Sequence, residues 1–412
     1  MPEPVYLLGG SHTDFARNWS KDSTTPLFDM LEETVNDCLA ATRVAPKEVE
    51  SAHVGNFAAE RFTGQAHLGA MVPMLDPHWA SLPTARHEAA CASGSIAILA
   101  GMAEIEAGRY DVVLVTGVEL MRNMPGEEAA HHLGCAAWTP EETNPESLPW
   151  PTLFDRISEE IDRRHGLEQQ HLNRISEINR TNARRNPLAQ TRDWTLSADQ
   201  FTDDDLANPV VTGRLRKSDC GRITDGAAAV VLASREFAEE WARRRSGGET
   251  GPSRIRGWGH RSAPLPLTAK FDLAPPGQYL FPNMRNAITD AYRRAALDGP
   301  RALDVIETHD CFTVNEYLAL EHFGLTAPGR AWEAIEEGVI DFDGPLPVNP
   351  SGGLIGAGHP VGATGVRMLL DAHRQVTGAA GEYQVPGART AATLNIGGSN
   401  STAVSFVVGD AA

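Results

Sequence analysis

The sequence is poor in lysine and cysteine, and it contains no long apolar run. Of its 412 residues only four are lysine and five are cysteine, and the formal net charge is -18. This acidity, without a basic stripe, argues against nucleic-acid binding. No segment is apolar enough to cross a bilayer and no basic-then-apolar leader begins the chain, so we expect neither a membrane span nor a signal peptide. The scattered cysteines indicate no disulfide framework and fit a reducing cytoplasm.

Motifs for common cofactors and metals are also missing. The chain has no Gly-x-x-x-x-Gly-Lys-Ser/Thr phosphate loop, and the glycines around Gly356 and Gly362 miss the dinucleotide-binding spacing by one residue. His131, His132 and Cys135 lie close together, but no paired Cys-x-x-Cys accompanies them, so we expect no metal site. A hydrophobic content of 42% and a charged content of 22% are typical of a globular protein. The length allows two or three domain-sized units.

Cys91 lies in the most informative segment, Ala89-Ala90-Cys91-Ala92-Ser93-Gly94. Residues 82–87 predict a strand before it, and residues 96–106 have the apolar spacing of a helix after it. Free backbone N–H groups and the positive end of a helix dipole stabilise a thiolate at such a junction. The small neighbours leave room for an acyl group. Because a lone buried cysteine is usually inert packing, Cys91 becomes a candidate nucleophile only with further residues.

Two distant segments supply such residues. His309 closes a predicted strand and precedes a predicted helix, while His359 lies in a glycine-rich bend that leads into another helix. A nucleophilic cysteine needs a base to take its proton, and its acyl intermediates need donors at the developing oxyanion. Either histidine alone would be interpreted as a capping or core residue. Three junctions that each carry Cys or His instead favour one shared catalytic site.

These motifs resemble those of the thiolase superfamily, and the resemblance covers almost the whole chain. Cys91-Ala92-Ser93-Gly94 is similar to the family's nucleophile motif, and Gly358-His359-Pro360 is similar to its Gly-His-Pro motif. His309-Asp310-Cys311-Phe312 stands where the commoner members carry Asn-Glu-Ala-Phe, and it resembles the form in sterol-carrier-protein-linked thiolases. The resemblance implies an α/β fold of duplicated αβαβα layers with an inserted loop domain.

The chain departs from the family pattern near its C-terminus. The commoner thiolases have Cys-x-Gly there, with a cysteine that serves as the second acid/base, whereas this chain has Asn395-Ile396-Gly397. An amide does not transfer protons at neutral pH. The resemblance therefore implies either that Cys311 supplies this function or that the reaction does not need it. The backbone N–H of Gly397 stays a candidate oxyanion donor.

The order of predicted elements divides the chain into two halves. Residues 1–248 are the expected N-terminal half, 249–412 the C-terminal half, and the Gly-rich stretch 246–252 is the expected linker. An inserted loop domain, carried on the first half at about 121–219, is rich in proline and contains a polar helix at 153–166. We expect the apolar strand 111–117 to pair across the two-fold axis of a homodimer or dimer of dimers.

Further elements follow from apolar periodicity. The sequence predicts strands at 5–9, 52–56, 226–233, from 254, 305–308, 391–395 and 403–408, and helices at 27–41, 283–296, 314–323 and 365–375. The helices that follow Cys91 and His359 are expected in comparable places of the two halves.

Coenzyme A, the substrate that the resemblance implies, is a polyanion and needs a local basic patch on this acidic chain. Two segments rich in basic residues are candidates, 180–192 and 214–222. From them we expect contacts to CoA phosphates by Arg184, Arg185, Arg214, Arg216 and Lys217, although a single arginine is more often solvated. No permanently bound cofactor is expected.

We therefore expect a thiolase-type acyl-CoA C-acyltransferase, which cleaves a 3-ketoacyl-CoA thiolytically or runs the reverse Claisen condensation. Cys91 would form an acyl-enzyme, and His359 would activate it and help bind an oxyanion. His309 would be the second donor, and Cys311 would move the proton of the α-carbon. Three alternatives stay open: a ketoacyl-synthase-like enzyme, a condensing subunit with a small zinc-ribbon OB-fold partner protein, and a non-catalytic scaffold subunit.

Overall fold

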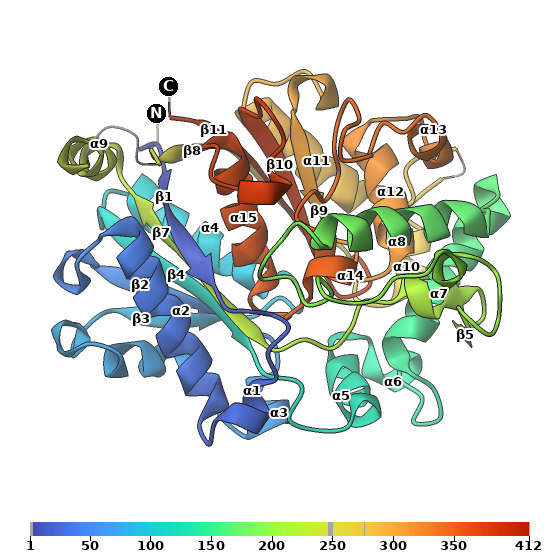
Figure 1. The fold of residues 1–412 in the computed structure, drawn as a ribbon, viewed down its shortest axis with the longest axis horizontal. Helices are drawn as coiled ribbons and strands as arrows, with labels where there is room; N and C mark the ends of the chain where they lie inside the picture. The colour runs from blue at the N-terminus through green and yellow to red at the C-terminus, as the bar shows by residue number, and fades with distance from the viewer. Residues whose placement is uncertain (1–2, 246–249, 276, 412) are drawn as a thin grey trace.

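The computed structural model describes residues 3–245, 250–275 and 277–411. Nine strands form one continuous sheet in the order β3-β2-β4-β7-β1-β8-β11-β10-β9 (Figure 1). Its N-terminal strands are β1 (Tyr6–His12), β2 (Ser51–Gly55), β3 (Thr84–His87), β4 (Val112–Glu119) and β7 (Gly226–Ala233). Its C-terminal strands are β8 (Ser253–Ser262), β9 (Val305–Thr308), β10 (Thr390–Gly397) and β11 (Thr402–Asp410). Residues 246–249 of the expected linker at 246–252 lie outside the described residues.

The two halves of the sheet repeat one pairing pattern. In the first half, β1 pairs antiparallel with β7 and β7 antiparallel with β4, whereas β4 and β2 and then β2 and β3 are parallel. In the second half, β8, β11, β10 and β9 pair in the same directions, and one parallel bridge from Ile306 to Val348 takes the fifth place. The halves meet where β1 pairs with β8. This repeat confirms the duplicated fold.

Helices form the other layers. The main ones are α2 (Pro26–Thr42), α4 (Ser93–Glu106), α11 (Pro282–Arg294), α12 (Thr313–Phe323) and α15 (Thr364–Val376). The shorter ones are α1 (Trp19–Asp22), α3 (Ala59–Thr63), α9 (Arg235–Arg244), α10 (Leu267–Phe271), α13 (Ala331–Glu336) and α14 (Gly353–Ala357). α4 and α15 contact each other between the two half-sheets, α2 covers the outer face of the first half-sheet, and α11 covers that of the second (Figure 1). The helices that follow Cys91 and His359 thus occupy comparable places.

Strand β7 shows why the central strands are apolar throughout. Alternate side chains of a strand point to opposite faces of a sheet. Ala228, Val230 and Leu232 therefore pack in the central layer with α4 and α15, whereas Ala229 and Val231 pack under α2. Because both faces are covered, no polar alternation survives, as is typical of strands buried on both sides.

The strand expected at a dimer interface lies inside the sheet. β4 contains 112–117 and pairs with β2 on one side and β7 on the other, so its backbone groups are already bonded. The prediction that this strand pairs across a two-fold axis is therefore wrong. Within the described residues the edge strand of the first half is β3, which pairs with β2 alone.

The insertion is mainly helical and packs on the second half. It contains α5 (Gly126–Leu133), α6 (Thr139–Glu142), α7 (Pro149–His165), α8 (Gln169–Ala183), β5 (Val210–Thr212) and β6 (Leu215–Arg216). Its apolar side chains Ile157 and Ile175 share one core with Met284 of α11 and Tyr317 of α12. Arg174 of α8 also pairs with Asp341 (2.9 Å). The insertion expected at about 121–219 thus leaves the first half between β4 and β7 and contributes to the core of the second half. The many Asn and Arg residues of α8 hid the apolar spacing of this helix.

Candidate active site

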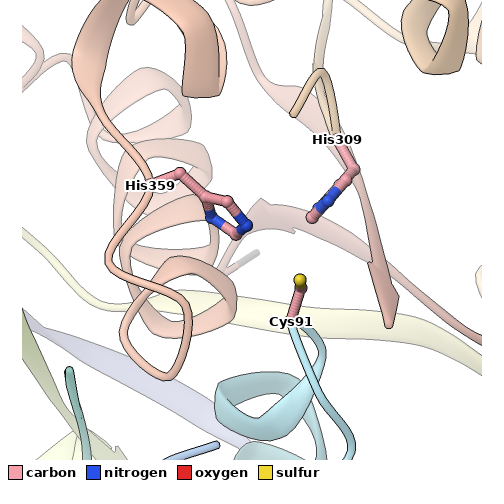
Figure 2. Close-up of side chains that lie close together, drawn as sticks. All are labelled: Cys91, His309 and His359. Atoms are coloured by element: carbon pink, nitrogen blue, oxygen red, sulfur yellow. The ribbon is translucent and has the colours of Figure 1, made fainter. Parts of the chain in front are cut away.

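Cys91, His309 and His359 come together from three junctions. Cys91 lies between β3 and α4, His309 directly follows β9, and His359 lies between α14 and α15. Figure 2 shows the thiol and the two imidazoles facing one another. One donor atom of each residue lies within 4.8 Å of the other two, and the perpendicular rings have centroids 5.1 Å apart. The geometry therefore joins the three residues in one site.

A glycine and a buried carboxylate allow this close approach. A Cβ on Gly94, in the first turn of α4, would lie 2.7 Å from the carbonyl oxygen of Gly362 in the loop that follows His359. The buried carboxylate of Glu119 accepts hydrogen bonds from the N–H groups of Gly362 (3.0 Å) and Phe57 (2.9 Å). Glu119 thus ties the His359 loop to the first half. Sequence reasoning missed Glu119, whose signal is a carboxylate at the end of an apolar strand.

The nucleophile loop is held in a tight turn. Ala90, directly before Cys91, adopts φ +50°, a left-handed conformation that costs a residue with a Cβ about 1 kcal/mol or more. The Ser93 hydroxyl accepts from the N–H of Ala89 (3.0 Å) and donates to the carbonyl of Ala90 (2.6 Å). The turn therefore fixes where the Cys91 sulfur lies.

Cys91, the candidate nucleophile, is a thiol at rest. Burial raises the pKa of Cys91 to about 12, and only backbone N–H groups, those of Gly398 and of Cys91 itself, act in the opposite direction. The sequence indicates that the helix end stabilises a thiolate, but the cost of desolvating the charge outweighs that stabilisation. The amide at the sulfur also belongs to Gly398, one residue after the expected Gly397. A base must remove the thiol proton during attack.

His359 has the geometry of that base. Its Nδ1 lies 2.7 Å from the Thr364 hydroxyl oxygen, and this hydroxyl donates to the carbonyl of Pro360 (2.9 Å). Nδ1 therefore carries the ring proton, and Nε2 has a free lone pair. Nε2 is buried and has no hydrogen-bond partner among the described residues. Burial lowers the pKa of His359 to about 3, so the ring is neutral and able to accept a proton.

His309 is positioned by Asn395, the residue at the place of the missing cysteine. The amide nitrogen Nδ2 of Asn395 lies 3.2 Å from His309 Nδ1 and donates to the carbonyl of Cys91 (3.0 Å). Burial, followed by the nearby His359, lowers the pKa of His309 well below its usual value. Both histidines of the site are thus neutral at rest.

Cys311 lines the same cavity as Cys91 and His359. Its sulfur accepts a long hydrogen bond from the side-chain amide of Asn315 (3.9 Å). Burial, and then the proximity of Cys91, raise the pKa of Cys311 well above that of a free thiol. Cys311 is therefore a neutral thiol, which is the form that can give a proton to a carbanion.

Asp310, the residue after His309, connects the site to helices α14 and α8. Asp310 accepts from the N–H groups of Leu354 (2.5 Å) and Ile355 (3.1 Å) in α14, and from the side-chain amide of Asn179 (2.8 Å) in α8. These bonds hold α14, which leads to His359, against the helix that sequence reasoning did not predict. α8 is consequently part of the scaffold of the site.

The cavity above Cys91 has a volume of about 260 Å³ and an apolar and a basic end. The apolar end is formed by the insertion and the loop after β2: Phe57, Met121, Ala130, Leu133, Trp150 and Phe154. The basic end carries Lys217 and Arg222. Both residues also line an adjoining cavity of about 360 Å³, together with Arg180 and Trp194. In the part of the chain that the structure describes, the buried Nε of Arg222 has no hydrogen-bond partner.

Of the five basic residues expected to contact CoA, only Lys217 lines these two cavities. Arg214 pairs with Asp162 (2.5 Å), and Arg216 pairs with Asp205 (2.8 Å). Arg185 stacks on Phe342 beside a different cavity, and Arg184 is exposed on the surface. The basic residues that do line the cavities with Lys217 are Arg180 and Arg222. Sequence spacing alone did not separate them from their neighbours.

Comparison with family models and curated proteins covers most of the chain. The model described as "Thiolase, N-terminal domain" matches residues 5–185, and "Thiolase C-terminal domain-like" matches residues 274–410. An acetyl-CoA acetyltransferase of Methanothermobacter thermautotrophicus is 32% identical over 402 residues, 97% of each chain. Sterol carrier protein 2 of Homo sapiens is 28% identical over 408 residues, which are 95% of this chain and 70% of that protein.

Solved structures share the fold. One titled "Ltp2-ChsH2(DUF35) aldolase" has a TM-score of 0.78 at 19% identity and covers 99% of this chain and 98% of that one. Human mitochondrial 3-ketoacyl-CoA thiolase in complex with CoA has a TM-score of 0.72 at 17% identity, with coverage of 100% and 98%.

Proposed function

The chain belongs to the thiolase family and is an acyltransferase, and we propose that it works through an acyl-enzyme on Cys91. The observation that carries this proposal is the Cys91 thiol beside an unpartnered Nε2 of His359, with His309 completing a set of donor atoms within 4.8 Å. The reaction would be thiolysis of a 3-ketoacyl-CoA or the reverse Claisen condensation. Because the same groups serve both directions, the geometry favours neither.

The first step forms the thioester on Cys91. The sulfur attacks the keto carbon as its proton moves to His359 Nε2, and the oxyanion accepts hydrogen bonds from the backbone N–H of Gly398 and from His309. In thiolysis, the bond between C2 and C3 of the 3-ketoacyl-CoA then breaks. It leaves the acyl group on sulfur and the electron pair on C2 of the departing acyl-CoA. Only interactions stronger in this transition state than in the bound substrate raise kcat.

The proton for C2 would come from Cys311. Its neutral thiol lines the cavity beside Cys91, as a donor to a carbanion must. The proton held by His359 then passes to the Cys311 thiolate, which restores both groups. Free CoA attacks the acyl-Cys91 thioester and gives its thiol proton to His359, and the departing Cys91 sulfur takes that proton back as acyl-CoA is released. In the condensation direction the same groups take the proton from C2 and form the carbon–carbon bond.

CoA would enter from the basic end of the cavity. Lys217, Arg222 and Arg180 supply positive charge there, and the unpartnered Nε of Arg222 is a free donor for a phosphate oxygen. Trp194, whose ring centroid lies 5.8 Å from the guanidinium carbons of both arginines, offers a flat surface for the adenine. The acyl group would lie on the apolar wall formed by α5 and α7.

Assembly and location remain further proposals. The β3 edge is the candidate surface for a homodimer or a dimer of dimers, and sedimentation of the purified chain tests it. The structural similarity to "Ltp2-ChsH2(DUF35) aldolase" motivates a test for a small zinc-ribbon OB-fold partner by co-purification. All five cysteines are unpaired, which supports a cytoplasmic location. No helix of the described residues has the length and apolarity to span a membrane.

Mass spectrometry of the intact protein tests the proposal. After incubation with a panel of acyl-CoA thioesters, the chain should gain one acyl mass, localised to Cys91 by peptide mapping. Cys91→Ser is the matched control and should stay folded without a rapidly formed adduct, because a hydroxyl is far less acidic than a thiol. An adduct that forms at the wild-type rate in Cys91→Ser would show that the nucleophile is another residue.

A further inference from the structure

Asn395 makes three hydrogen-bond contacts that together determine the orientation of its amide. Its side chain is 1% exposed and lies between β9 and the nucleophile loop. One atom of the amide lies 3.0 Å from the carbonyl oxygen of Cys91, which can only accept, so that atom must be the nitrogen Nδ2. The oxygen Oδ1 then accepts from the Ser95 hydroxyl (2.8 Å). No choice of amide flip remains.

This orientation determines the protonation of the neighbouring imidazole. The same Nδ2 lies 3.2 Å from His309 Nδ1, and an amide nitrogen has only protons to offer. Nδ1 must therefore be the unprotonated nitrogen, and the single proton of the neutral ring is on Nε2. His359 has the opposite arrangement, with its proton on Nδ1 facing Thr364. One imidazole of the site is thus a base and the other a donor.

We infer that Asn395 is the positioning residue that holds His309 in the Nε2–H tautomer and so makes it an oxyanion donor. The inference rests on the proposed function for the role of that donor, but the tautomer itself is a property of the resting protein. Asn395, at the usual cysteine position, would then serve the reaction by orienting His309 and would transfer no proton itself.

Within the described residues, no carboxylate acts to raise the pKa of the His309 ring. The groups that act on its titration are His359 and Arg367, both of which lower its pKa, and the Cys91 thiol lies within the same 4.8 Å set. The ring therefore stays neutral in the working pH range, and its tautomer depends on the hydrogen bond at Nδ1.

The wild-type protein provides the first test. In a long-range ¹H–¹⁵N spectrum of histidine-labelled protein, assigned with a His309→Asn variant, the unprotonated nitrogen of His309 should be Nδ1. Ser95→Ala is the matched control, because it removes the contact at Oδ1 and leaves both contacts of Nδ2, and it should show the same tautomer. A proton found on Nδ1 in the wild type would overturn the inference, whatever the acylation assays show.

The second test compares Asn395→Asp with Asn395→Ala. The isosteric carboxylate accepts from Nδ1–H, so a neutral His309 would be left with a bare Nε2, and kcat should fall about 10²- to 10³-fold, as for loss of one oxyanion donor. At lower pH the ring becomes an imidazolium paired with the carboxylate and regains Nε2–H. The kcat of Asn395→Asp should therefore decrease as pH rises through the pKa of that pair, whereas the wild type shows no such decrease.

Asn395→Ala should be the milder change, because it leaves the ring free to adopt either tautomer. If Asn395 only filled space, the isosteric Asp would be milder than Ala, and neither variant would acquire a new pH dependence. That order would overturn the inference. kcat is measured per folded site, and acylation is followed separately in a single turnover, so that failure of acylation in the wild type would count against the proposed function and not against the tautomer.

Discussion

Replacing His359 by Asn tests the most consequential feature of the proposed site, a nucleophile and a base that are both neutral at rest. The side-chain amide of Asn can still donate to Thr364, as His359 Nδ1 does at 2.7 Å, but it cannot accept a proton from Cys91. Acylation must then start from thiolate that has already formed in the buried site. Loss of a general base typically slows a reaction about 10²- to 10⁴-fold.

The pH dependence gives the sharper result. With a Cys91 pKa of about 12, the thiolate fraction at pH 7 is on the order of 10⁻⁵, because each pH unit changes it tenfold. The acylation rate of His359→Asn should therefore rise about tenfold per pH unit, or roughly a hundredfold from pH 7 to pH 9. The wild type should stay level over this range, since His359, with a pKa of about 3, remains unprotonated and able to accept the proton.

Rapid quench with acyl-CoA, followed by mass spectrometry of the intact protein, measures both profiles. His309→Asn is the control: it should be slower than the wild type but equally level with pH, because His359 is intact. A wild-type inflection between about pH 6 and 8 would indicate a thiolate–imidazolium pair and refute the neutral resting state. A pH-independent rate in His359→Asn would refute the assignment of the base.

Three further predictions concern the surroundings of the nucleophile. Cys311→Ala should leave acylation nearly unchanged but slow exchange of the α-protons of acetyl-CoA with deuterated solvent about 10²- to 10⁴-fold; unchanged exchange would refute its role. Arg222→Met should raise the KM for CoA about tenfold or more with kcat retained, whereas Arg214→Met should leave the KM unchanged. Equal effects of the two changes on the KM would refute the assignment of the phosphate site to Arg222. Lys270 is buried, and its amino group donates to Ser399 in the turn between β10 and β11 that carries Gly398, so Lys270→Met should lower stability by about 1–3 kcal/mol. Calorimetry of this variant should show a lower Tm, and single-turnover experiments should show slower acylation with unchanged acyl-CoA affinity. Acylation of the variant at the wild-type rate would mean that the turn does not depend on this contact.

The secondary structure was largely predictable because apolar periodicity is a local property of the chain. β7 and β9 have the predicted bounds, and α2, α11, α12 and α15 differ from prediction by only a few residues. α8 was missed because its buried face includes Asn173, Asn179 and Asn182, whose polarity masks the spacing of its isoleucines. Asn179 and Asn182 bond to groups of the second half that are remote in sequence, Asp310 and the carbonyl of Asn349.

The sequence by itself determined which side chains we propose for the chemistry: the motifs around Cys91, His309, Cys311 and His359 indicate a nucleophile and its partners by type and order. Only the tertiary structure decided their states. Burial overcomes the helix end and keeps Cys91 a thiol, because the desolvation of a charge depends on everything packed around it. Likewise, the packing of both halves and the insertion decides which arginines reach the cavity. No local pattern contains these contacts, because they join residues that are far apart in the chain.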